Sequence, residues 1–417
     1  MSYVTENTID KRLARVNAAI SLKEGDRVPF APKILPYAQA GGISMYELYH
    51  DFRNMKQGVV NFLARYEPDF YYQIAAYPAN VLQVLGSTAI HWPGAAGKLP
   101  LNTGHQILDG EYMLEEEYDE FLRNPSEFFM RKIYPRKNAK LAGLSKVSFS
   151  DVFEFGMFAG LAPFADPEVR SALLTLMYAG EEVVKWQAAC GELAQVALEM
   201  QTPLGVILGQ NAPYDMLADN LRGYIQLPMD VLVIPDKVLA AIDVMTDLAL
   251  KGVHKIKAMG LQYVFIPLHG GPDDLMSNET YAKFYWPSLK RLIEEIVKLD
   301  MTPYLFLEGK YDSRLEIIRD VPVGKCYYTF EKVDIARAKK VLGDTVCIAG
   351  NLDTATLVFG KKQQVIDETK RMLDACAPGG GFIMDCSIIT DNFDPENVNV
   401  WENLDAWRET TLKYGKY

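Results

Sequence analysis

The second half of the chain alternates short apolar runs with longer segments of helical periodicity, and this alternation restricts the fold more than any other feature of the sequence. Apolar runs of four to six residues bounded by turn signals are typical of buried strands. Strands that alternate with helices form βαβ units, which build parallel sheets. From residue 203 onward the sequence predicts six strands: Leu204–Leu208, Tyr263–Pro267, Pro303–Leu307, Cys326–Phe330, Val346–Ala349 and Phe382–Asp385.

Two further strands are predicted near the N-terminus, at Val28–Ile34 and Asp69–Ala75. Eight strands, most of them followed by a helix, predict a (β/α)8 TIM-type barrel with an N-terminal helical elaboration. Because no linker, repeat or low-complexity run interrupts the sequence, we expect residues 1–417 to form one domain, with residues 1–25 as a helical extension. The main predicted helices are Ile9–Ile20, Ser44–Arg65, Tyr118–Asn124, Glu168–Met200, Pro235–Met259, Asn278–Leu299, Val333–Val341 and Lys361–Cys376.

Charge and cysteine content exclude several classes of partner. The formal net charge of −11 argues against a nucleic-acid or anionic-membrane partner, which would require a basic face. No stretch of 18 uninterrupted apolar residues is present, and the polar start MSYVTENTIDKR lacks the apolar core of a signal peptide. The five cysteines have no regular spacing. We therefore expect a reduced, cytoplasmic protein without disulfides.

Polar residues follow several of the predicted strands, where a parallel barrel collects its functional side chains. His269 and Glu308 each end an apolar run, and Tyr311 and Arg314 follow Glu308 closely. Asp215 either points into the barrel mouth or caps a helix. Glu308 either faces the mouth as a partly desolvated carboxylate or forms a salt bridge with Arg314 that only fixes the loop. The remaining candidates are Tyr214, Asn351, Asp353, Asp385 and Cys386.

The stretch Val152–Asp166 is apolar and rich in Gly and Ala, with charge only at Glu154 and Asp166. Two interpretations are open. The segment is either buried packing between two helices, which we favour, or a lid or wall over a substrate pocket.

The C-terminal part of the sequence resembles a known superfamily. It reads G-N-L-D, a helical span, G-G-G-F-I, and then a polar loop closed by P-E-N-V. This series is similar to the C-terminal signature of the uroporphyrinogen decarboxylase superfamily. That superfamily contains the decarboxylases of haem synthesis and methyltransferases that pass methyl groups to or from corrinoid cofactors. The resemblance runs from about Val28 to the C-terminus and is strongest from Ala212 onward.

The sequence departs from the decarboxylase pattern at the positions that hold the substrate. Uroporphyrinogen decarboxylases carry an Arg-rich segment after the first strand, whereas this chain has APKILPYAQAGG with Lys33 as its only cation. The aspartate that receives the pyrroles is replaced by Gln73 or a neighbour, and the Gly-His of the last loop by Cys386–Ser387. A polyanionic tetrapyrrole would lose most of its partners, so the resemblance disfavours porphyrinogen decarboxylation.

The loops A-P-Y-D…D-x-L-R-G, LHGGPDD and LFLEGKYDSRLE look like those of the corrinoid methyltransferase branch, in particular the substrate methyltransferases of anaerobic O-demethylases. The implied reaction moves a methyl group from a methoxylated substrate, such as an aryl methyl ether, to the Co(I) corrinoid (cobalamin) of a separate carrier protein. The poor aryl-oxide leaving group requires a general acid or a metal at the ether oxygen. The expected catalytic residues are Glu308, His269, Asp215 and Tyr311, and the expected substrate-binding residues are Tyr214, Asn351, Arg314 and Asp385.

A zinc site is implied by resemblance to the zinc-dependent coenzyme M methyltransferases. Their L-H-x-C-G motif places Phe306 at the histidine position and Glu308 at the first cysteine position, and a second cysteine falls at or next to Cys386. His269 would supply the missing nitrogen, giving His269, Glu308 and Cys386 as an open three-ligand site. A competing set is Asp320, Cys347 and Cys386, with Cys347 expected to lie too deep. A metal-free site is the third possibility.

Two other functions remain open at this point. One is a decarboxylase of a smaller acid on the same fold. The other is a non-catalytic barrel that binds a corrinoid or tetrapyrrole.

Overall fold

Eight extended segments form a ring in the computed structural model, which describes residues 7–74, 76–95, 98–148, 150–394, 396 and 398–417. Five of them form one parallel sheet in sequence order, and two more pair in parallel beside it. The sheet contains β5 (Tyr263–Leu268), β6 (Thr302–Lys310), β7 (Tyr327–Lys332), β8 (Cys347–Ala349) and β9 (Phe382–Ile383), and the pair consists of β1 (Tyr71–Tyr72) and β4 (Leu204–Val206).

Backbone hydrogen bonds join these strands into a barrel. Gly209, just after β4, pairs in parallel with Phe265 of β5. On the other side, Phe30 pairs in parallel with Met384, which follows β9. The backbone N–H of Asp69 donates to the carbonyl of Phe30 at 2.7 Å and brings residues 28–34 beside β1. The order 28–34, β1, β4 and then β5 to β9 confirms the predicted (β/α)8 fold class.

Residues 28–34 differ from the prediction because they form isolated bridges at Phe30 and Ile34 instead of a regular strand. Pro29 and Pro32 remove two backbone N–H donors from this short segment. The predicted strand at residues 69–75 is reduced to β1, and Ala75 itself lies outside the described residues.

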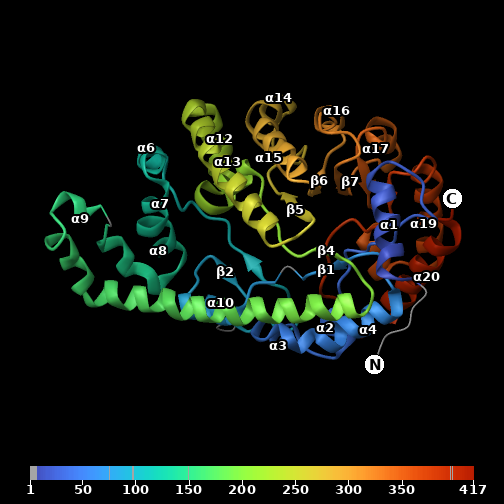
Figure 1. Cartoon of the computed structure of the whole chain (residues 1–417), viewed down its shortest axis with the longest axis horizontal. Helices are drawn as coiled ribbons and strands as arrows, with labels where there is room; N and C mark the ends of the chain where they lie inside the picture. The colour runs from blue at the N-terminus through green and yellow to red at the C-terminus, as the bar shows by residue number, and fades with distance from the viewer. Residues whose placement is uncertain (1–6, 75, 96–97, 149, 395, 397) are drawn as a thin grey trace.

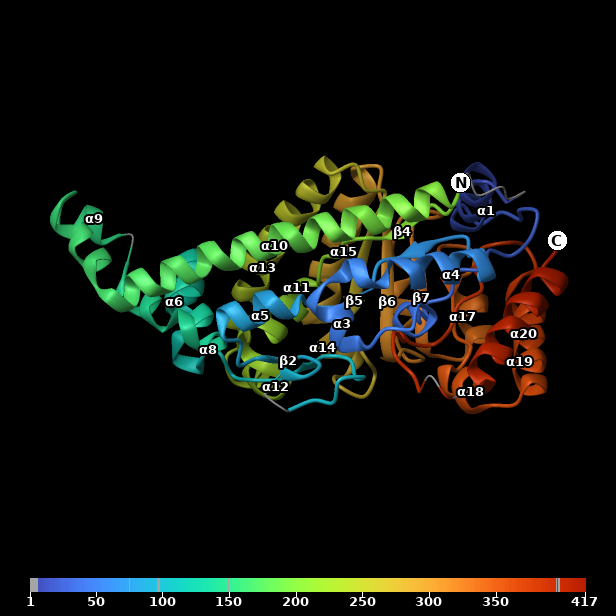
Figure 2. The same ribbon diagram turned by 90° about the horizontal axis from the view of Figure 1, so that it is seen from below.

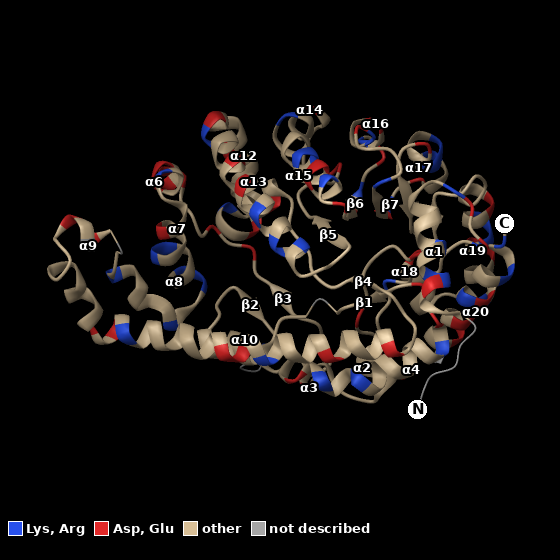
Figure 3. Ribbon diagram, in the orientation of Figure 1, with Lys and Arg blue, Asp and Glu red and all other residues tan. Residues whose placement is uncertain are grey.

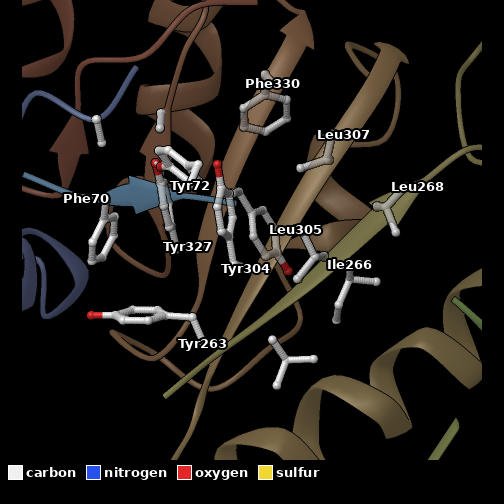
Figure 4. Packing of buried hydrophobic residues seen from close by; sticks show 14 of the residues in the cluster. Phe70, Tyr72, Tyr263, Ile266, Leu268, Tyr304, Leu305, Leu307, Tyr327 and Phe330 are labelled. Carbon is white, nitrogen blue, oxygen red and sulfur yellow. The ribbon is translucent and has the colours of Figure 1, made fainter. Parts of the chain in front are cut away.

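Aromatic side chains fill the interior of the barrel (Figure 4). The rings of Tyr304 and Tyr327 stack with centroids 4.2 Å apart, and the Tyr72 and Tyr327 hydroxyls lie 3.5 Å apart. Phe70 packs edge-on against Tyr263 at 4.8 Å. The barrel is therefore a packed core that supports chemistry at its rim.

Helices surround the barrel, and their apolar faces explain their positions. On α15, buried Leu289, Leu292, Ile293 and Ile296 form one stripe that packs on β6 and α13. The helices are α1 (Ile9–Ile20), α2 (Tyr37–Gly41), α3 (Met45–His50), α4 (Lys56–Tyr66), α5 (Ala79–Leu85), α6 (Tyr118–Arg123), α7 (Pro125–Phe128), α8 (Tyr134–Lys137), α9 (Asp151–Glu154), α10 (Pro167–Glu199), α11 (Pro213–Leu217), α12 (Gly223–Val233), α13 (Pro235–Ala258), α14 (Asn278–Thr280), α15 (Trp286–Lys298), α16 (Leu315–Ile318), α17 (Ile335–Leu342), α18 (Thr354–Phe359), α19 (Lys362–Cys376) and α20 (Val398–Tyr414). Short 3-10 or π turns are η1 (Phe52–Met55), η3 (Glu115–Glu117), η4 (Phe129–Ile133), η5 (Ala139–Lys146), η6 (Ala159–Ala165), η7 (Ala218–Arg222) and η8 (Tyr281–Tyr285).

The molecule is elongated because α10 extends well beyond the barrel (Figures 1 and 2). Asp166 caps this helix by accepting hydrogen bonds from the backbone of Glu168 and Val169, and Pro167 occupies its first position. One part of α10 lies beside α4, near the barrel, and the other carries η5 and η6. A short hairpin of β2 (Ile90–His91) and β3 (Gln106–Ile107), which the sequence did not predict, lies between these regions.

Residues 152–166 form the far end of this arm, a position that the sequence did not predict. The side chain of Val152 lies outside the described residues, but Phe153 is 90% exposed and Phe158 is 85% exposed, so the segment is not buried packing. Phe153 does line a cavity of about 330 Å³, together with residues of α7, η4 and η5. That cavity lies in the arm, so the segment is not a lid over the barrel mouth.

Charged residues lie along the helices and at strand ends, and the strand interiors are largely uncharged (Figure 3). Within the described part of the chain, no helix combines the length and the apolar character needed to cross a bilayer.

Candidate functional site

A cavity of about 350 Å³ lies at the carboxyl ends of β6 and β7. In a parallel barrel this end carries the functional side chains, because the loops that follow the strands converge there. The lining comes from the loop before β3, the ends of β6 and β7, and the loop after β9. The lining residues are Gly104, His105, Phe306, Glu308, Glu331, Ile388, Ile389 and Asp391.

Glu308 reaches this cavity from an irregular end of β6, as predicted from its position after the apolar run. The register between β6 and β7 shifts after Leu307, and Gly309 adopts φ of +73°, which a residue with a Cβ rarely takes. The backbone N–H of Gly309 donates to Glu331 Oε2 at 2.7 Å. The bulge thus fixes Glu308 and Glu331 side by side at the rim of the cavity.

His269 connects Glu308 to a second carboxylate. It directly follows β5, and its Nδ1 donates to Asp219 Oδ2 at 3.1 Å. Its Nε2 lies 3.8 Å from Glu308 Oε1. The predicted position of His269 at the barrel mouth is therefore confirmed, and its two ring nitrogens face two different acids.

The surroundings shift the pKa values of both groups upward. Burial alone lowers the pKa of His269, but the hydrogen bond to Asp219 and the charges of Glu308 and Asp215 outweigh it and raise that pKa to about 10. Burial raises the pKa of Glu308; the charge of His269 opposes the rise, and the charge of Glu331 adds to it. Both shifts favour the protonated forms of the two groups.

Asp219 is a site residue that the sequence reasoning missed. It lies on the π turn η7, where its carboxylate accepts hydrogen bonds from Tyr224 Oη at 2.7 Å and Asn211 Nδ2 at 2.8 Å, besides the one from His269. The signal was present, because Asp219 opens the D-x-L-R-G stretch and follows Asp215 by one helical turn.

Asp215 is fully buried beneath the turn that carries His269 and does not face the cavity. It accepts hydrogen bonds from the backbone N–H groups of His269 at 3.0 Å and Gly270 at 2.8 Å, and from Tyr285 Oη at 2.6 Å. Burial raises the pKa of Asp215 to about 7. Asp215 therefore does not point into the barrel mouth. It does not cap a helix either, because α11 begins two positions earlier, at Pro213. Asp215 holds the His269 turn in place.

Two tyrosines predicted at the mouth are buried near the same turn. Tyr214 is 2% exposed and packs against Tyr285 with ring centroids 5.3 Å apart. Tyr311 is fully buried, and a Cβ on Gly271 would lie 2.0 Å from its hydroxyl. Neither side chain lines the cavity, in contrast to the prediction, because the loop around Gly271 covers both.

Arg314 and Asn351 also lie away from the cavity lining. Arg314 is fully buried, donates to the carbonyls of Pro272 and Met276, and pairs with Asp273 with Nε 3.2 Å from Oδ1. The alternative salt bridge between Arg314 and Glu308 is therefore wrong. Asn351 Nδ2 donates to the carbonyl of Val333 at 2.9 Å, which ties the ends of β7 and β8 together.

Asp385 lies below the cavity in a buried ion pair with Lys33. Lys33 Nζ also donates to Thr329 Oγ1 at 2.6 Å and to the carbonyl of Cys386 at 2.8 Å. It lies 5.3 Å from the centroid of the Phe306 ring, which lines the cavity. The ion pair thus supports the cavity floor, and Asp385 is not free to bind substrate there.

The proposed metal ligands are not assembled. Among the residues with described positions, no three His, Cys, Asp or Glu side chains form a group that could hold a metal ion. Cys386 is fully buried, its Sγ donates to the carbonyl of Ile388 at 3.4 Å, and burial raises the pKa of its thiol to about 12. The competing set fails because the Asp320 side chain is 72% exposed and pairs with Lys290, whereas Cys347 is buried as expected. The donor set does not fit zinc.

Three ionisable lining residues, Glu331, Asp391 and His105, were not assigned from the sequence. Glu331 ends the apolar run of β7 as Glu308 ends that of β6, so the same rule would have found it. Asp391 and His105 come from loops whose positions depend on the tertiary fold. His105 Nδ1 lies 2.7 Å from Tyr49 Oη, and burial lowers the pKa of its imidazole.

The molecule is thus a parallel barrel with a cluster of acids around one imidazole at its carboxyl end. The pattern described as uroporphyrinogen decarboxylase (URO-D) matches residues 176–404, more than half of the sequence. The chain belongs to the uroporphyrinogen decarboxylase family, which confirms the predicted superfamily.

Individual relatives come from both branches of that superfamily. A uroporphyrinogen decarboxylase of Chlorobium phaeobacteroides is 26% identical over 175 residues, covering 38% of this chain and 48% of the relative. A methylated-thiol–coenzyme M methyltransferase of Methanosarcina mazei is 25% identical over 194 residues, covering 46% of this chain and 51% of the relative. The chain thus spans about half the length of these relatives.

One solved structure resembles the chain over nearly its whole length. A methyltransferase from Methanosarcina mazei superposes with a TM-score of 0.63 at 14% identity, covering 98% of this chain and 99% of that one. This similarity supports the fold, arm included.

Proposed function

We propose that this chain is a methyltransferase that moves a methyl group from a methoxylated substrate, an aryl methyl ether, to the Co(I) corrinoid of a separate carrier protein. The likeness to methyltransferases of Methanosarcina mazei in sequence and in fold supports the branch. The observation that carries the proposal is the Glu308–His269–Asp219 array beside the cavity.

The chemistry requires a proton at the leaving oxygen. When the methyl carbon passes to the acceptor, the C–O bond breaks and its electron pair stays on oxygen. An aryl oxide leaves slowly unless it is protonated as it forms. Glu308 lines the cavity and has a raised pKa, so it is positioned to donate that proton. His269 then returns a proton to Glu308, with Asp219 holding the imidazole in orientation.

The apolar part of the lining gives the substrate its position. Phe306, Ile388 and Ile389 form a wall suited to an aromatic ring, and the cavity volume of about 350 Å³ accommodates one small molecule. Holding the methyl carbon in line with its acceptor supplies much of the rate by removing orientational freedom. The acceptor acts as a second substrate, carried on its own protein.

Two other functions are less well supported. Decarboxylation of a small acid would bring a carboxylate into an acidic lining, and Lys33, the nearby cation, is already paired with Asp385. A non-catalytic binding barrel gives no reason for three acids around one imidazole, since clustered groups with shifted pKa values are typical of catalytic sites.

The proposal is tested by mixing the purified chain with a Co(I)-corrinoid carrier and 3-methoxyphenol. We expect methylation of the carrier, followed by its absorbance, together with release of one equivalent of resorcinol. Loss of carbon dioxide from an acid substrate without carrier methylation would support the decarboxylase instead. Carrier binding with no turnover would support the binding barrel.

A further inference from the structure

The charged groups around the cavity are strongly unequal in sign. Three of its eight lining residues carry carboxyl groups, Glu308, Glu331 and Asp391, of which Glu308 is the proposed proton donor, and none of the eight is Lys or Arg. The fourth ionisable residue of the lining is His105. The cavity is therefore an acidic chamber with an apolar wall.

Neighbouring cations compensate these carboxylates only in part. Glu308 has His269 at 3.8 Å, and Glu331 has Lys332 at 3.7 Å, but the Lys332 side chain is 72% exposed and its pairing is screened by solvent. Asp391 has no salt bridge to any residue in the described ranges. A carboxylate in a partly buried position without a counter-charge is costly, so a cation from the ligand would relieve it.

The cation below the floor does not change this balance. Lys33 Nζ is buried, lies 5.3 Å from the centroid of the Phe306 ring and is paired with Asp385, so the opposite charges of the pair largely cancel at the distance of a ligand in the cavity. The cavity-facing part of Phe306 adds an aromatic surface, which attracts cations as well as rings. The charge of the lining and the aromatic surface of Phe306 therefore both favour a cationic ligand.

We infer that the cavity selects a methyl donor with a positive charge, namely an aryl methyl ether that carries an ammonium group, over one that carries a carboxylate. This inference rests on the proposed function for the identity of the donor, but it concerns binding and is tested without the carrier. Glu331 and Asp391 are its specificity-determining residues, and Glu308 remains the proton donor.

The test is a matched series measured by calorimetry on the whole chain: 3-methoxybenzylamine, 3-methoxybenzyl alcohol and 3-methoxybenzoate. We expect the amine to bind about tenfold more tightly than the alcohol, and the benzoate to bind at least about tenfold more weakly than the alcohol. Equal or tighter binding of the benzoate, or no measurable binding of all three, would overturn the inference.

Variants that each remove one carboxylate show which residues cause the preference for the amine over the benzoate. Glu331→Gln keeps an oxygen for the Gly309 N–H and Asp391→Asn keeps the side-chain size, so each should reduce the ratio of amine to benzoate affinity about three- to tenfold. Glu316→Gln is the control, because Glu316 is an exposed carboxylate on α16 outside the cavity lining. Ratios that stay constant in both cavity variants contradict the inference. If the three ligands bind in the expected order but no methyl transfer to the carrier is detected, the proposed function is refuted and the inference about binding stands.

Discussion

At the scale of single side chains, the reactivity of this site depends on which groups share protons. His269 lies between Asp219 and Glu308, and each acid stabilises its imidazolium. Glu308 in turn has Glu331 beside it at the rim of the cavity. Close negative charges raise carboxyl and imidazole pKa values alike, which is how a general acid keeps its proton at neutral pH.

Removing the charge of Asp219 should move the pH dependence of catalysis. Asp219 raises the pKa of His269 through a hydrogen bond and adds to the rise at Glu308. In Asp219→Asn both pKa values fall, so the alkaline limb of the rate profile should shift to lower pH, with a rate loss of about tenfold or more at pH 8. The control is Asp243→Asn, an exposed position on α13. An unshifted limb would show that Asp219 does not act through the pair.

The protonation of His269 should make the stability of the folded protein depend on pH within a defined range. The folded-state pKa of His269, about 10, lies above its ordinary 6.5, so the folded protein binds the proton more tightly. The stabilisation is complete below about pH 6.5 and is lost as pH rises toward 10. Thermal unfolding of wild type and His269→Gln should give a difference in Tm that shrinks across this window. A constant difference would mean that the imidazole stabilises by packing.

Sequence reasoning at this scale found side chains that follow long strands and missed those whose positions depend on the tertiary fold. Glu308 and His269 could be predicted because an apolar run fixes where a strand ends. Asp219 was missed although its spacing from Asp215 was a signal, since its contact with His269 joins residues 50 positions apart. Arg314 and Asp385 were misplaced because a sequence does not reveal whether a strand-end charge already has a buried partner.

At the scale of elements, the joint between residues 28–34 and the segment after β9 is held by backbone hydrogen bonds and by buried side chains together. The backbone contributes bridges at Phe30 and Ile34. Lys33 adds its buried contacts to Asp385, Thr329 and the carbonyl of Cys386. A buried ion pair thus adds to the backbone hydrogen bonds that close the barrel through this proline-rich segment.

Replacing Lys33 should destabilise the protein strongly. Lys33→Met leaves Asp385 buried without its counter-charge, which costs about 3–5 kcal/mol. Denaturant unfolding of the variant beside wild type measures the loss. The double variant Lys33→Met with Asp385→Leu removes both charges and should recover most of the stability. A small loss in the single variant would show that the seam does not depend on this pair.

The regular elements were predicted more accurately than the irregular ones. β5, β6, β7 and β8 and the helices α1, α10, α13 and α19 appear within a few residues of their predicted bounds, because apolar periodicity and capping residues act locally. The β2–β3 hairpin was not predicted, since its two-residue strands carry too little pattern. The predicted helix at residues 278–299 is divided by the π turn η8, which precedes Pro287.

At the scale of the whole molecule, the barrel and the α10 arm form an elongated structure whose single-domain organisation stays a prediction. The five cysteines are free thiols in the structure, which agrees with the expected absence of disulfides. Four of them are buried, and Cys190 is partly exposed. The exposed apolar tip at residues 153–161 could not be predicted, because such apolar runs usually pack inside a protein.

The acidic cavity predicts that the chain lacks uroporphyrinogen decarboxylase activity, despite its family. A substrate with many carboxylates would face Glu308, Glu331 and Asp391 without an arginine in the lining to pair with it. Incubation with uroporphyrinogen at catalytic enzyme levels should yield no coproporphyrinogen, with an authentic decarboxylase as positive control. Measurable product would contradict this reading of the cavity.

The central claim is that Glu308 protonates the leaving oxygen, and a leaving-group series on Glu308→Gln tests it most directly. Glutamine keeps the size and removes the proton, so methyl transfer from 4-methoxyphenol, whose oxide is basic, should fall about a hundred- to ten-thousandfold. Transfer from 4-nitroanisole, whose oxide leaves without a proton, should change little. An equal loss for both substrates, with folding confirmed by circular dichroism, or no loss for either, would contradict the account.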